Sequence, residues 1–482
     1  MTRSPAAAFQ SDVGLEVHVQ LKTASKIWCG CPNRYGSPAN SDVCPVCLGY
    51  PGSLPVMNRH AVELTVKTGL MLGCEINRYS KWDRKNYFYP DMPKNYQISQ
   101  YDLPLCIGGA VEIDIGGQRK RVGLTRIHLE EDVGKNTHYE GRSSVDFNRA
   151  GTPLMEIVTE PDMGSADEAL AFLLALKEIL AYGAVSDCNL EEGNLRCDVN
   201  CSVRPAGDTA LGVKTEIKNM NTFKGVHRAL DHELKRQIAE RTQGGAIVQE
   251  TRRWDDEMGV TSAMRTKEQA HDYRYFSEPD LLPVVLSKES IDEISSTLPE
   301  LPKARRMRFE AEYGIPAYDA GVLVADRALA DYYEAAAAAS GNYKAVSNWV
   351  MGEMLRALAE TGTEITGCRV EPEALAALVR LVDEKAINST GAKEVFQEMF
   401  ERGGEPQGIV EARGLAQVSD TGAIEALVEQ AIGEHPDSAQ DVRNGKEKAL
   451  QHLMGQVMRL SRGKANPQLV LELLRERLSP GA

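Results

Sequence analysis

The sequence contains no long hydrophobic run and few cysteines. None of its apolar stretches approaches the roughly 18 consecutive residues that a membrane span needs. Residues 1–11 contain one Arg and a short Ala run, without the apolar segment of a signal peptide. Ten cysteines among 482 residues are too sparse for a disulfide scaffold. Together these absences predict a cytoplasmic protein with reduced thiols and no membrane association.

Several common enzyme motifs are also missing. The sequence has no GxxxxGK[ST] motif, which excludes a P-loop nucleotide site, and no GxSxG, HExxH or GxGxxG signature. A net charge of −14 argues against a protein that coats nucleic acid, although a local basic face can still bind phosphates. Residues 441–482 form such a face, because they hold eight basic residues against four acidic ones.

The composition is that of an ordinary globular protein, and the pattern of apolar and polar residues differs between the two parts of the chain. At 42% hydrophobic and 26% charged residues, a chain of this length is expected to fold into about three domains. From Val13 to Leu286, apolar and polar residues mostly alternate, which predicts antiparallel strands. Within that region, helices are expected at 166–182 and 222–243. After Leu298 the pattern becomes that of amphipathic helices, including 326–339 and 345–361, so the sequence predicts an α+β protein.

Four cysteines form a CxC…CxxC pattern, with Gly and Pro in the short turns between them. They are Cys29, Cys31, Cys44 and Cys47. Two close thiolate pairs suit tetrahedral zinc, and the alternative is a set of redox-active or structural free thiols. Zinc is the preferred interpretation. By contrast, Cys197 and Cys201 share the apolar face of a predicted strand and are expected to be packed in the core.

Acidic residues recur on the polar faces of predicted strands. Glu16 and His18 lie two residues apart on a strand, roughly 6.6 Å from each other, and can share one cation. Further acidic residues lie on the polar faces of other predicted strands, namely Asp198 and Glu216, and the stretch 128–132 is rich in them. Carboxylates with one His suit Mg²⁺ or Mn²⁺, whereas the alternative for an isolated pair is a solvated sheet face.

The segment 81–91 interleaves basic and aromatic residues. Its Lys85 is expected to hold a phosphate as a point charge if it lies near the acidic face. Its aromatic residues, Tyr87, Phe88 and Tyr89, are equally compatible with a place in the core.

Taken together, motifs along nearly the whole chain, from Val13 to Leu478, resemble one family. They include Gly14-Leu-Glu-Val-His18, Arg84-Lys-Asn-Tyr-Phe-Tyr-Pro-Asp91, Tyr96-Gln-Ile-Ser-Gln100, His128-Leu-Glu-Glu-Asp132, Gly151-Thr-Pro-Leu-Met-Glu156, Glu191-Glu-Gly-Asn-Leu-Arg-Cys-Asp198, Glu216-Ile-Lys-Asn219, Asp272-Tyr-Arg-Tyr-Phe276 and Gly463-Lys-Ala-Asn-Pro467. Their order is similar to that in the GatB family, which comprises the GatB subunits of the aspartyl/glutamyl-tRNA(Asn/Gln) amidotransferases.

This resemblance implies a domain organisation. A flexible N-terminus (1–12) would precede a mainly antiparallel cradle domain with a zinc knuckle (13–297). An all-helical domain (298–404) and a small helical tail similar to the YqeY proteins (405–482) would follow.

The resemblance also implies a reaction. Proteins of this family bind misacylated Glu-tRNA(Gln) or Asp-tRNA(Asn) and activate the side-chain carboxylate with ATP as an acyl phosphate. Ammonia, made from glutamine by a glutaminase subunit, then displaces the phosphate, while a third, small subunit joins the other two. Basic residues of the tail would contact the tRNA; they are Arg459, Arg462 and Lys464.

Carried over by motif, the family's Mg²⁺ site corresponds to Glu16, His18, Glu131, Asp198 and Glu216. Lys85 and Glu156 would lie nearby as catalytic residues, and the zinc would be structural. One assignment stays open: strand alternation places Glu130, and not Glu131, on the same side as His128.

Two other functions remain as alternatives. A tRNA-binding scaffold without chemistry would explain the basic tail and the zinc knuckle, but it has no use for converging carboxylates. A stand-alone metal hydrolase would be active without partner subunits. The sequence does not decide whether Glu-tRNA(Gln), Asp-tRNA(Asn) or both are the substrates.

Overall fold

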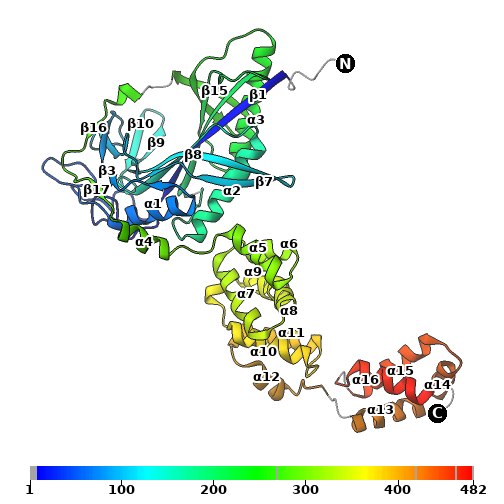
Figure 1. The fold of residues 1–482 in the computed structure, drawn as a ribbon. Helices are drawn as coiled ribbons and strands as arrows, with labels where there is room; N and C mark the ends of the chain where they lie inside the picture. Colours follow the sequence, from blue (N-terminus) through cyan, green and yellow to red (C-terminus); the bar gives the residue numbers. More distant parts are fainter. Residues whose placement is uncertain (1–7, 191, 267–269, 418–420, 462–463, 480–482) are drawn as a thin grey trace. The chain divides into compact units, whose positions relative to one another are not determined.

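The computed structural model describes residues 8–190, 192–266, 270–417, 421–461 and 464–479. The chain divides into two compact units, Met1–Leu301 and Pro302–Ala482. All strands of the described residues belong to the first unit, and the second is helical (Figure 1). The predicted α+β class, with a mostly antiparallel sheet region before a helical region, is confirmed. No helix within these ranges combines the length and apolar character needed to cross a membrane.

A 10-stranded sheet dominates the first unit. Its order is β15-β14-β13-β12-β1-β11-β8-β6-β2, with β7 paired to β8, and only β13 and β14 run parallel. The strands are β1 (Phe9–Gln20), β2 (Glu75–Ile76), β6 (Cys106–Ile107), β7 (Ala110–Ile115), β8 (Gln118–Glu131), β11 (Pro153–Thr159), β12 (Leu195–Pro205), β13 (Thr215–Lys218), β14 (Glu250–Asp255) and β15 (Val260–Thr266). A hairpin turn at Gly116 and Gly117 joins β7 to β8, and both glycines have the positive φ that such a turn requires.

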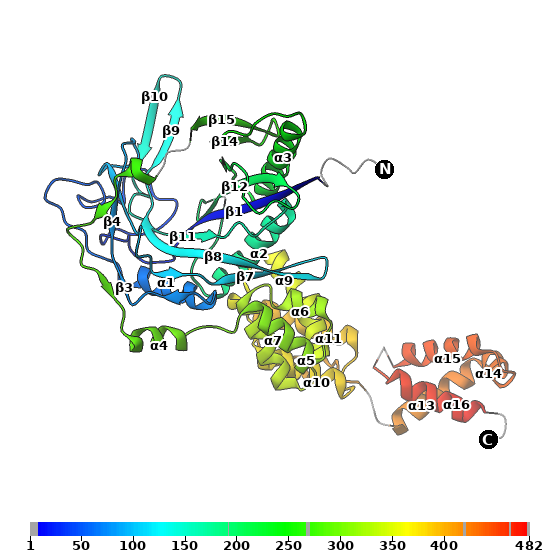
Figure 2. The ribbon, with the colours of Figure 1, turned by 45° about the horizontal axis from the view of Figure 1, so that its top comes forward.

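Strand β1 lies in the middle of this sheet, between β12 and β11. Its apolar residues, such as Val17, are fully buried in one hydrophobic core together with residues of α2 (Ala166–Tyr182) and α3 (Phe223–Thr242). These helices lie side by side against the sheet (Figure 2). They match the helices predicted at 166–182 and 222–243 because Ser165 and Thr222 cap their first turns. The alternate, polar residues of β1 therefore face away from the helices.

The expectation that residues 1–12 are flexible does not hold for residues 9–12. Strand β1 begins at Phe9, which pairs with Pro205 of β12. Asp12 is buried and accepts a hydrogen bond from Arg204 at 2.7 Å. Residues 9–12 are therefore held in the sheet, and residues 1–7 lie outside the described ranges.

Smaller elements surround the sheet. A three-stranded sheet has the order β16-β4-β5, and two pairs, β17 with β3 and β10 with β9, complete the strands. These elements are β3 (Tyr79–Ser80), β4 (Asp83–Asn86), β5 (Tyr96–Ser99), β9 (Lys135–Tyr139), β10 (Arg142–Asp146), β16 (Phe276–Ser277), β17 (Val284–Val285), the helices α1 (Arg59–Met71) and α4 (Lys288–Ser296), and the 3₁₀ turn η2 (Ala270–Tyr273).

The second unit consists of α-helices of ordinary length. They are α5 (Pro302–Tyr313), α6 (Ala317–Leu323), α7 (Arg327–Ser340), α8 (Tyr343–Trp349), α9 (Leu355–Thr361), α10 (Pro372–Asp383), α11 (Ser389–Arg402), α12 (Pro406–Arg413), α13 (Thr421–Glu434), α14 (Pro436–Arg443), α15 (Glu447–Leu460) and α16 (Pro467–Leu478). The single helix expected at 345–361 is interrupted by a π-helical turn, Val350–Met354. Helices α13 to α16 enclose a hydrophobic core of their own.

Candidate functional site

The polar face of the main sheet collects the acidic and histidine residues. In the register of β1, His18 lies opposite Glu156 of β11, and Glu16 lies opposite Asp198 of β12. His128 of β8 lies opposite Glu156 on the far side of β11. Because alternate residues of a strand share one face, strands far apart in the sequence bring these side chains together.

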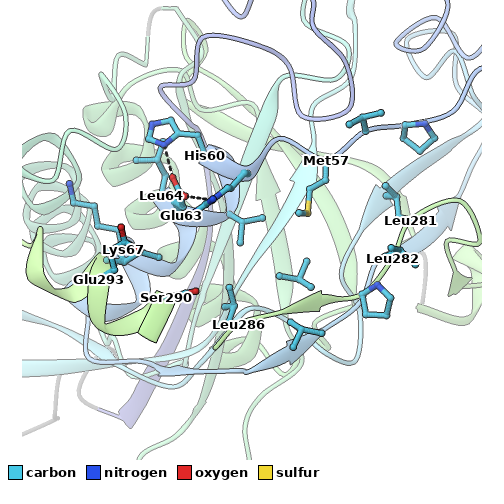
Figure 3. Close-up of a pocket in the computed structure, with 18 of the residues that line it drawn as sticks. Met57, His60, Glu63, Leu64, Lys67, Leu281, Leu282, Leu286, Ser290 and Glu293 are labelled. Atoms are coloured by element: carbon cyan, nitrogen blue, oxygen red, sulfur yellow. Dashed lines mark hydrogen bonds and ion pairs between the residues drawn. The ribbon is translucent and has the colours of Figure 1, made fainter. Parts of the chain in front are cut away.

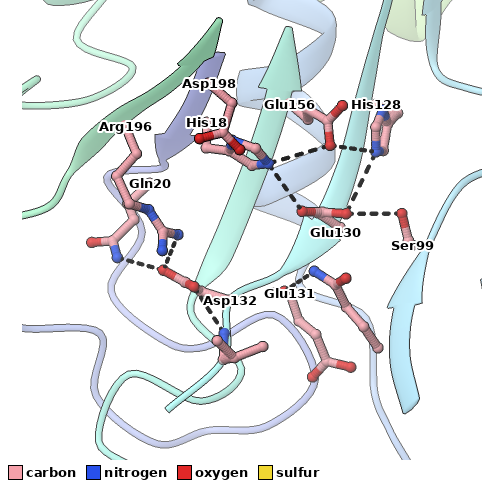
Figure 4. A network of polar contacts seen from close by, with 12 residues as sticks. His18, Gln20, Ser99, His128, Glu130, Glu131, Asp132, Glu156, Arg196 and Asp198 are labelled. Carbon is pink, nitrogen blue, oxygen red and sulfur yellow. Dashed lines mark hydrogen bonds and ion pairs between the residues drawn. The ribbon is translucent and has the colours of Figure 1, made fainter. Parts of the chain in front are cut away.

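Four of these residues form a histidine–glutamate cluster: His18, His128, Glu130 and Glu156 (Figure 4). His18 Nε2 lies 3.3 Å from Glu156 Oε2 and 3.9 Å from Glu130 Oε1. His128 Nε2 lies 3.6 Å and 3.5 Å from the same two carboxylates. Ser99 of β5 donates a hydrogen bond of 3.0 Å to Glu130. Two carboxylates and two imidazoles thus converge on one point of the sheet.

The two carboxylates of the histidine–glutamate cluster are ionised. Burial disfavours the charged carboxylates, but the charge of His128 and the hydrogen bond from His18 hold the pKa of Glu156 well below its usual range. A hydrogen bond from His128 likewise lowers the pKa of Glu130 against the effect of burial. Burial opposes protonation of His18, yet the hydrogen bond to Glu156 raises its pKa. Both carboxylates therefore carry negative charge at neutral pH.

Lys85 of β4 lies beside this cluster. Burial alone would lower its pKa, but the nearby acidic groups, Glu130 foremost, together outweigh burial and raise it, so the ammonium group stays charged. Its Nζ atom also lies 4.8 Å from the centre of the Tyr273 ring. The sequence-based expectation that Lys85 lies near the acidic face agrees with this placement.

A second group, the carboxylate cluster, lies on the neighbouring strands. Glu16, Asp198 and Glu216 offer oxygen atoms within 4.8 Å of one another. Lys218 of β13 donates a hydrogen bond to Asp198 and lies 3.5 Å from Glu216. Asn200 donates to Glu16 at 2.8 Å. Three carboxylates against one ammonium group leave this cluster with net negative charge.

Glu131 does not join either cluster, which corrects its assignment to the acidic site. Both of its carboxylate oxygens accept hydrogen bonds from Lys94, and one also accepts from the backbone N–H of Ile98 at 2.8 Å. Glu130 takes the place beside His18 instead (Figure 4). Strand β8 runs without a bulge through residues 126–131, so neighbouring glutamates point to opposite sides.

The next residue, Asp132, also lies apart from the clusters. It accepts hydrogen bonds or ion pairs from Gln20 at 2.8 Å, Arg196 at 2.7 Å and Arg149 at 3.6 Å. The charges of Arg196 and Arg149 lower its pKa even though burial opposes this. Asp132 thereby orients two arginines at the edge of the polar face.

The donor atoms of both clusters suit a metal ion. His18, Glu130 and Glu156 each offer an atom within 4.8 Å of the others, as do the members of the carboxylate cluster. Carboxylate oxygens with at most one imidazole nitrogen match hard divalent cations. A cation would also compensate the negative charge that Lys218 leaves unbalanced in the carboxylate cluster.

The four cysteines predicted as ligands lie together. The sulfur atoms of Cys29, Cys31, Cys44 and Cys47 all lie within 4.8 Å of one another, so they could hold a metal ion. A hydrogen bond from Cys29 lowers the pKa of Cys47 to about 5, which makes it a thiolate at neutral pH. Metal ions bind thiolates and not thiols. Cys197 and Cys201 are buried in the core, as expected.

Two cavities open on the first unit. One, of about 830 Å³, adjoins the polar face at Gln20 and Arg196. Its lining holds five basic residues (Lys22, Arg34, Lys135, Arg149 and Arg196) and three acidic ones (Asp146, Asp187 and Glu192). The other, of about 1000 Å³, is an apolar groove between α1, α4 and the segment 280–286 (Figure 3). Only the first combines basic side chains with the neighbouring acidic clusters, so it suits an anionic ligand.

The basic tail residues that were predicted to bind tRNA lie in the second unit. Arg459 is exposed in the last turn of α15, and Lys464 is exposed a few residues later. Arg462 lies outside the described residues. Their role in binding tRNA stays a prediction.

Sequence reasoning missed His128 and Lys218 as members of the site. The spacing of His128 and Glu130 on one strand was a usable signal, since residues two apart share a face. Lys218 follows Glu216 by the same spacing.

Comparisons with known proteins agree with the motifs. The model of the GatB/GatE catalytic domain family matches residues 11–292, and that of the GatB domain family matches residues 331–478. The first match contains both acidic clusters and the four cysteines. The second contains α8 to α16 together with Arg459 and Lys464.

Curated relatives match over almost their full length. The GatB subunit of the aspartyl/glutamyl-tRNA(Asn/Gln) amidotransferase from Caldanaerobacter subterraneus subsp. tengcongensis is 54% identical over 473 residues, which cover 98% of this chain and 99% of the relative. The protein of the same name from Carboxydothermus hydrogenoformans is 53% identical over 476 residues, with the same coverage. On sequence identity and matched domain families, the chain belongs to the family of GatB subunits of the aspartyl/glutamyl-tRNA(Asn/Gln) amidotransferases.

Proposed function

We propose that the polar face of the main sheet is where this protein phosphorylates and then amidates the side-chain carboxylate of a misacylated tRNA. The substrates are Glu-tRNA(Gln), Asp-tRNA(Asn) or both, and ATP is the phosphoryl donor. The observation that carries the proposal is the meeting of the histidine–glutamate cluster, the carboxylate cluster, the half-buried Lys85 and a cavity of about 830 Å³ on one face. Since such tRNAs serve protein synthesis, the expected compartment is the cytoplasm.

The reaction has two steps. A carboxylate oxygen of the esterified Glu or Asp attacks the γ-phosphorus of ATP, and ADP leaves. Ammonia then forms a bond to the carbonyl carbon, and inorganic phosphate leaves with the former carboxylate oxygen. One proton of the attacking ammonia is taken up by the departing inorganic phosphate, because the pKa of Glu156 lies well below its usual range and its carboxylate is assigned to the cation.

Charge is the main obstacle to the first step, because the phosphates and the carboxylate are all anionic. Lys85 and the arginines that line the cavity offset part of this repulsion. Mg²⁺ would add positive charge at the same place. Its ligands would be His18, Glu130 and Glu156 at one site, and Glu16, Asp198 and Glu216 at the other. Glu131 is held by Lys94 and is left out of this ligand set.

Ammonia requires a partner. As a member of the GatB family, the chain is part of an amidotransferase made of several subunits. We assign ammonia production to a glutaminase subunit, joined to this chain through a third, small subunit. A scaffold that only binds tRNA is the alternative, but clustered carboxylates would repel the phosphates of its ligand.

The assembled complex tests this function directly. Purified complex is incubated with ATP, ammonium and either Glu-tRNA(Gln) or Asp-tRNA(Asn), and the esterified amino acid is then identified by mass spectrometry. We expect Gln or Asn on the matching tRNA, and only when ATP is present. Tight tRNA binding with no conversion under any condition would favour the scaffold.

The four-cysteine site is expected to hold one structural zinc ion. Elemental analysis of the purified protein should give one zinc per chain, and Cys44→Ser should lose it because a tetrahedral thiolate site needs all four sulfurs. Cys368→Ser is the matched control, since Cys368 is also partly exposed but lies in the second unit. Wild-type protein without zinc, or Cys44→Ser with unchanged zinc, would contradict the assignment.

We assign tRNA binding to the basic residues of the tail. Each of Arg459→Gln and Lys464→Gln should weaken tRNA affinity a few-fold and reduce the slope of log affinity against log salt by roughly 0.7 to 0.9, as expected for one lost phosphate contact. The control is Lys235→Gln on α3, where an exposed lysine pairs with Asp231. Equal slopes for wild type and both tail variants would reject the assignment.

A further inference from the structure

An unusual group of aromatic rings lies beside the histidine–glutamate cluster. We name it the aromatic patch; its members are Phe88, Tyr101, Tyr273 and Tyr275. Tyr101 and Tyr275 stack with ring centres 4.3 Å apart and planes at 11°. Tyr273 meets Tyr275 edge-on at 6.1 Å. Tyr101, Tyr273 and Tyr275 therefore form one group of contacting rings, and Phe88 is joined to it through Arg274, whose guanidinium lies over the Phe88 ring.

Two members of the patch are exposed. Phe88 is 73% exposed and Tyr101 is 44% exposed. Core packing, the alternative considered for the segment 81–91, does not explain Phe88. An exposed flat ring next to a reaction site suits a planar ligand, and nucleic-acid bases stack on aromatic side chains irrespective of sequence.

Arg274 adds a cation to the patch. Its guanidinium lies 5.9 Å from the centre of the Phe88 ring. Its backbone has φ +47°, a left-handed conformation that is unfavourable for arginine. The side-chain amide of Asn86 stabilises this conformation, since it donates to the carbonyl oxygens of Tyr273 at 3.3 Å and Arg274 at 2.9 Å. Backbone strain of this kind is concentrated at functional sites.

The patch is connected to the reaction site through Lys85. The Lys85 ammonium lies over the Tyr273 ring, and its charge interacts with Glu130. Burial raises the pKa of Tyr275 to about 12; Lys85 opposes this rise, while Glu130 and Glu156 add to it. The patch is thus close enough to the clusters for one ligand to reach both.

We propose that the aromatic patch stacks the 3′-terminal adenosine of the aminoacyl-tRNA, with Phe88 as the main platform and Arg274 near its phosphate. This proposal rests on the function proposed above. The amino acid is esterified to the terminal ribose, so the terminal adenine is the base nearest to the reacting carboxylate. All tRNAs end in CCA, and a platform that recognises stacking alone would therefore serve both tRNA(Gln) and tRNA(Asn).

The test measures KM for misacylated tRNA at saturating ATP and ammonium, with the complex intact. Phe88→Ala should raise this KM about tenfold and leave kcat nearly unchanged, because a base–aromatic stack contributes to binding in both the ground and transition states. Phe88→Tyr should keep the wild-type KM. Tyr89→Ala is the matched control, since Tyr89 is a neighbouring exposed ring outside the patch.

A change in the tRNA identifies the base that is bound. A tRNA with terminal cytidine, which offers a smaller ring, should raise KM several-fold with the wild-type enzyme and much less with Phe88→Ala. Equal effects of the cytidine on both enzymes would overturn the proposal. A rise in KM for ATP, with KM for tRNA unchanged, would also overturn it and would assign the patch to the adenine of ATP.

Rejection of the proposed function gives a different result from rejection of the aromatic patch alone. In that case the wild-type complex would form no amide on either tRNA. If the wild type is active and Phe88→Ala has the wild-type KM for both substrates, only the aromatic patch proposal is rejected.

Discussion

Glu130→Gln is expected to reduce amide formation on the tRNA by roughly a hundredfold or more, even with external ammonia. Glu130 contacts His18, His128 and Ser99, and its charge holds Lys85 protonated. The amide keeps the shape of the side chain but removes an anionic ligand and this electrostatic partner. External ammonia bypasses the glutaminase, so the loss would be located in this protein. The measurement is the rate of Gln or Asn formation on misacylated tRNA.

Glu131→Gln is the matched control for this experiment. The same substitution one residue later affects a carboxylate that binds only Lys94 and Ile98. We expect a near-normal rate in the folded protein and a lower melting temperature, because loss of Glu131 leaves a buried ammonium without its partner, at a cost of about 3 kcal/mol. The reverse pattern, with Glu131→Gln inactive but stable and Glu130→Gln active, would restore Glu131 as the site residue.

Asp198→Asn is expected to abolish ATP hydrolysis that depends on misacylated tRNA. Asp198 is one of three carboxylates within 4.8 Å, and replacing it weakens a cation site that the proposed phosphoryl transfer requires. Folding should be retained, since Lys218 still lies 3.5 Å from Glu216 and one like charge is removed from the cluster. Release of inorganic phosphate, measured with and without misacylated tRNA, reports this step indirectly, because the phosphate that leaves in the second step comes from the acyl phosphate formed in the first.

The control for Asp198→Asn is Asp231→Asn on α3. Asp231 is an exposed carboxylate paired with Lys235 and lies away from the polar face. It should leave tRNA-dependent phosphate release unchanged. If Asp198→Asn retains near-normal release, the carboxylate cluster is not part of the phosphoryl-transfer site.

Much of the fold was predictable because local signals agree with tertiary packing. Alternation in residues 15–21 correctly separated Val17 from Glu16 and His18, and capping residues together with the apolar stripe located α2. The π-helical turn at Val350–Met354 carries no such signal, since it inserts extra residues into an otherwise regular helical pattern. The start of β1 at Phe9 depends on pairing with β12, which local sequence does not reveal.

The candidate site also depends partly on strand pairing that local sequence does not reveal. Alternation along β8 favours Glu130 beside His128, and the structure places Glu130, and not the motif-based choice Glu131, next to His18. Resemblance carries no information on which way a side chain points. The opposition of His18 and Glu156 depends on the register of β1 and β11, two strands more than a hundred residues apart in the chain. Lys218 enters the site only through the pairing of β12 with β13.

The central claim is that this protein activates the side-chain carboxylate as an acyl phosphate. The most direct test uses misacylated tRNA in which both side-chain carboxylate oxygens are ¹⁸O, incubated with the complex, ATP and ammonium. We expect each amide formed to release one inorganic phosphate carrying a single ¹⁸O atom, since the carboxylate oxygen leaves with phosphorus. Amide formation accompanied by unlabelled phosphate would contradict it.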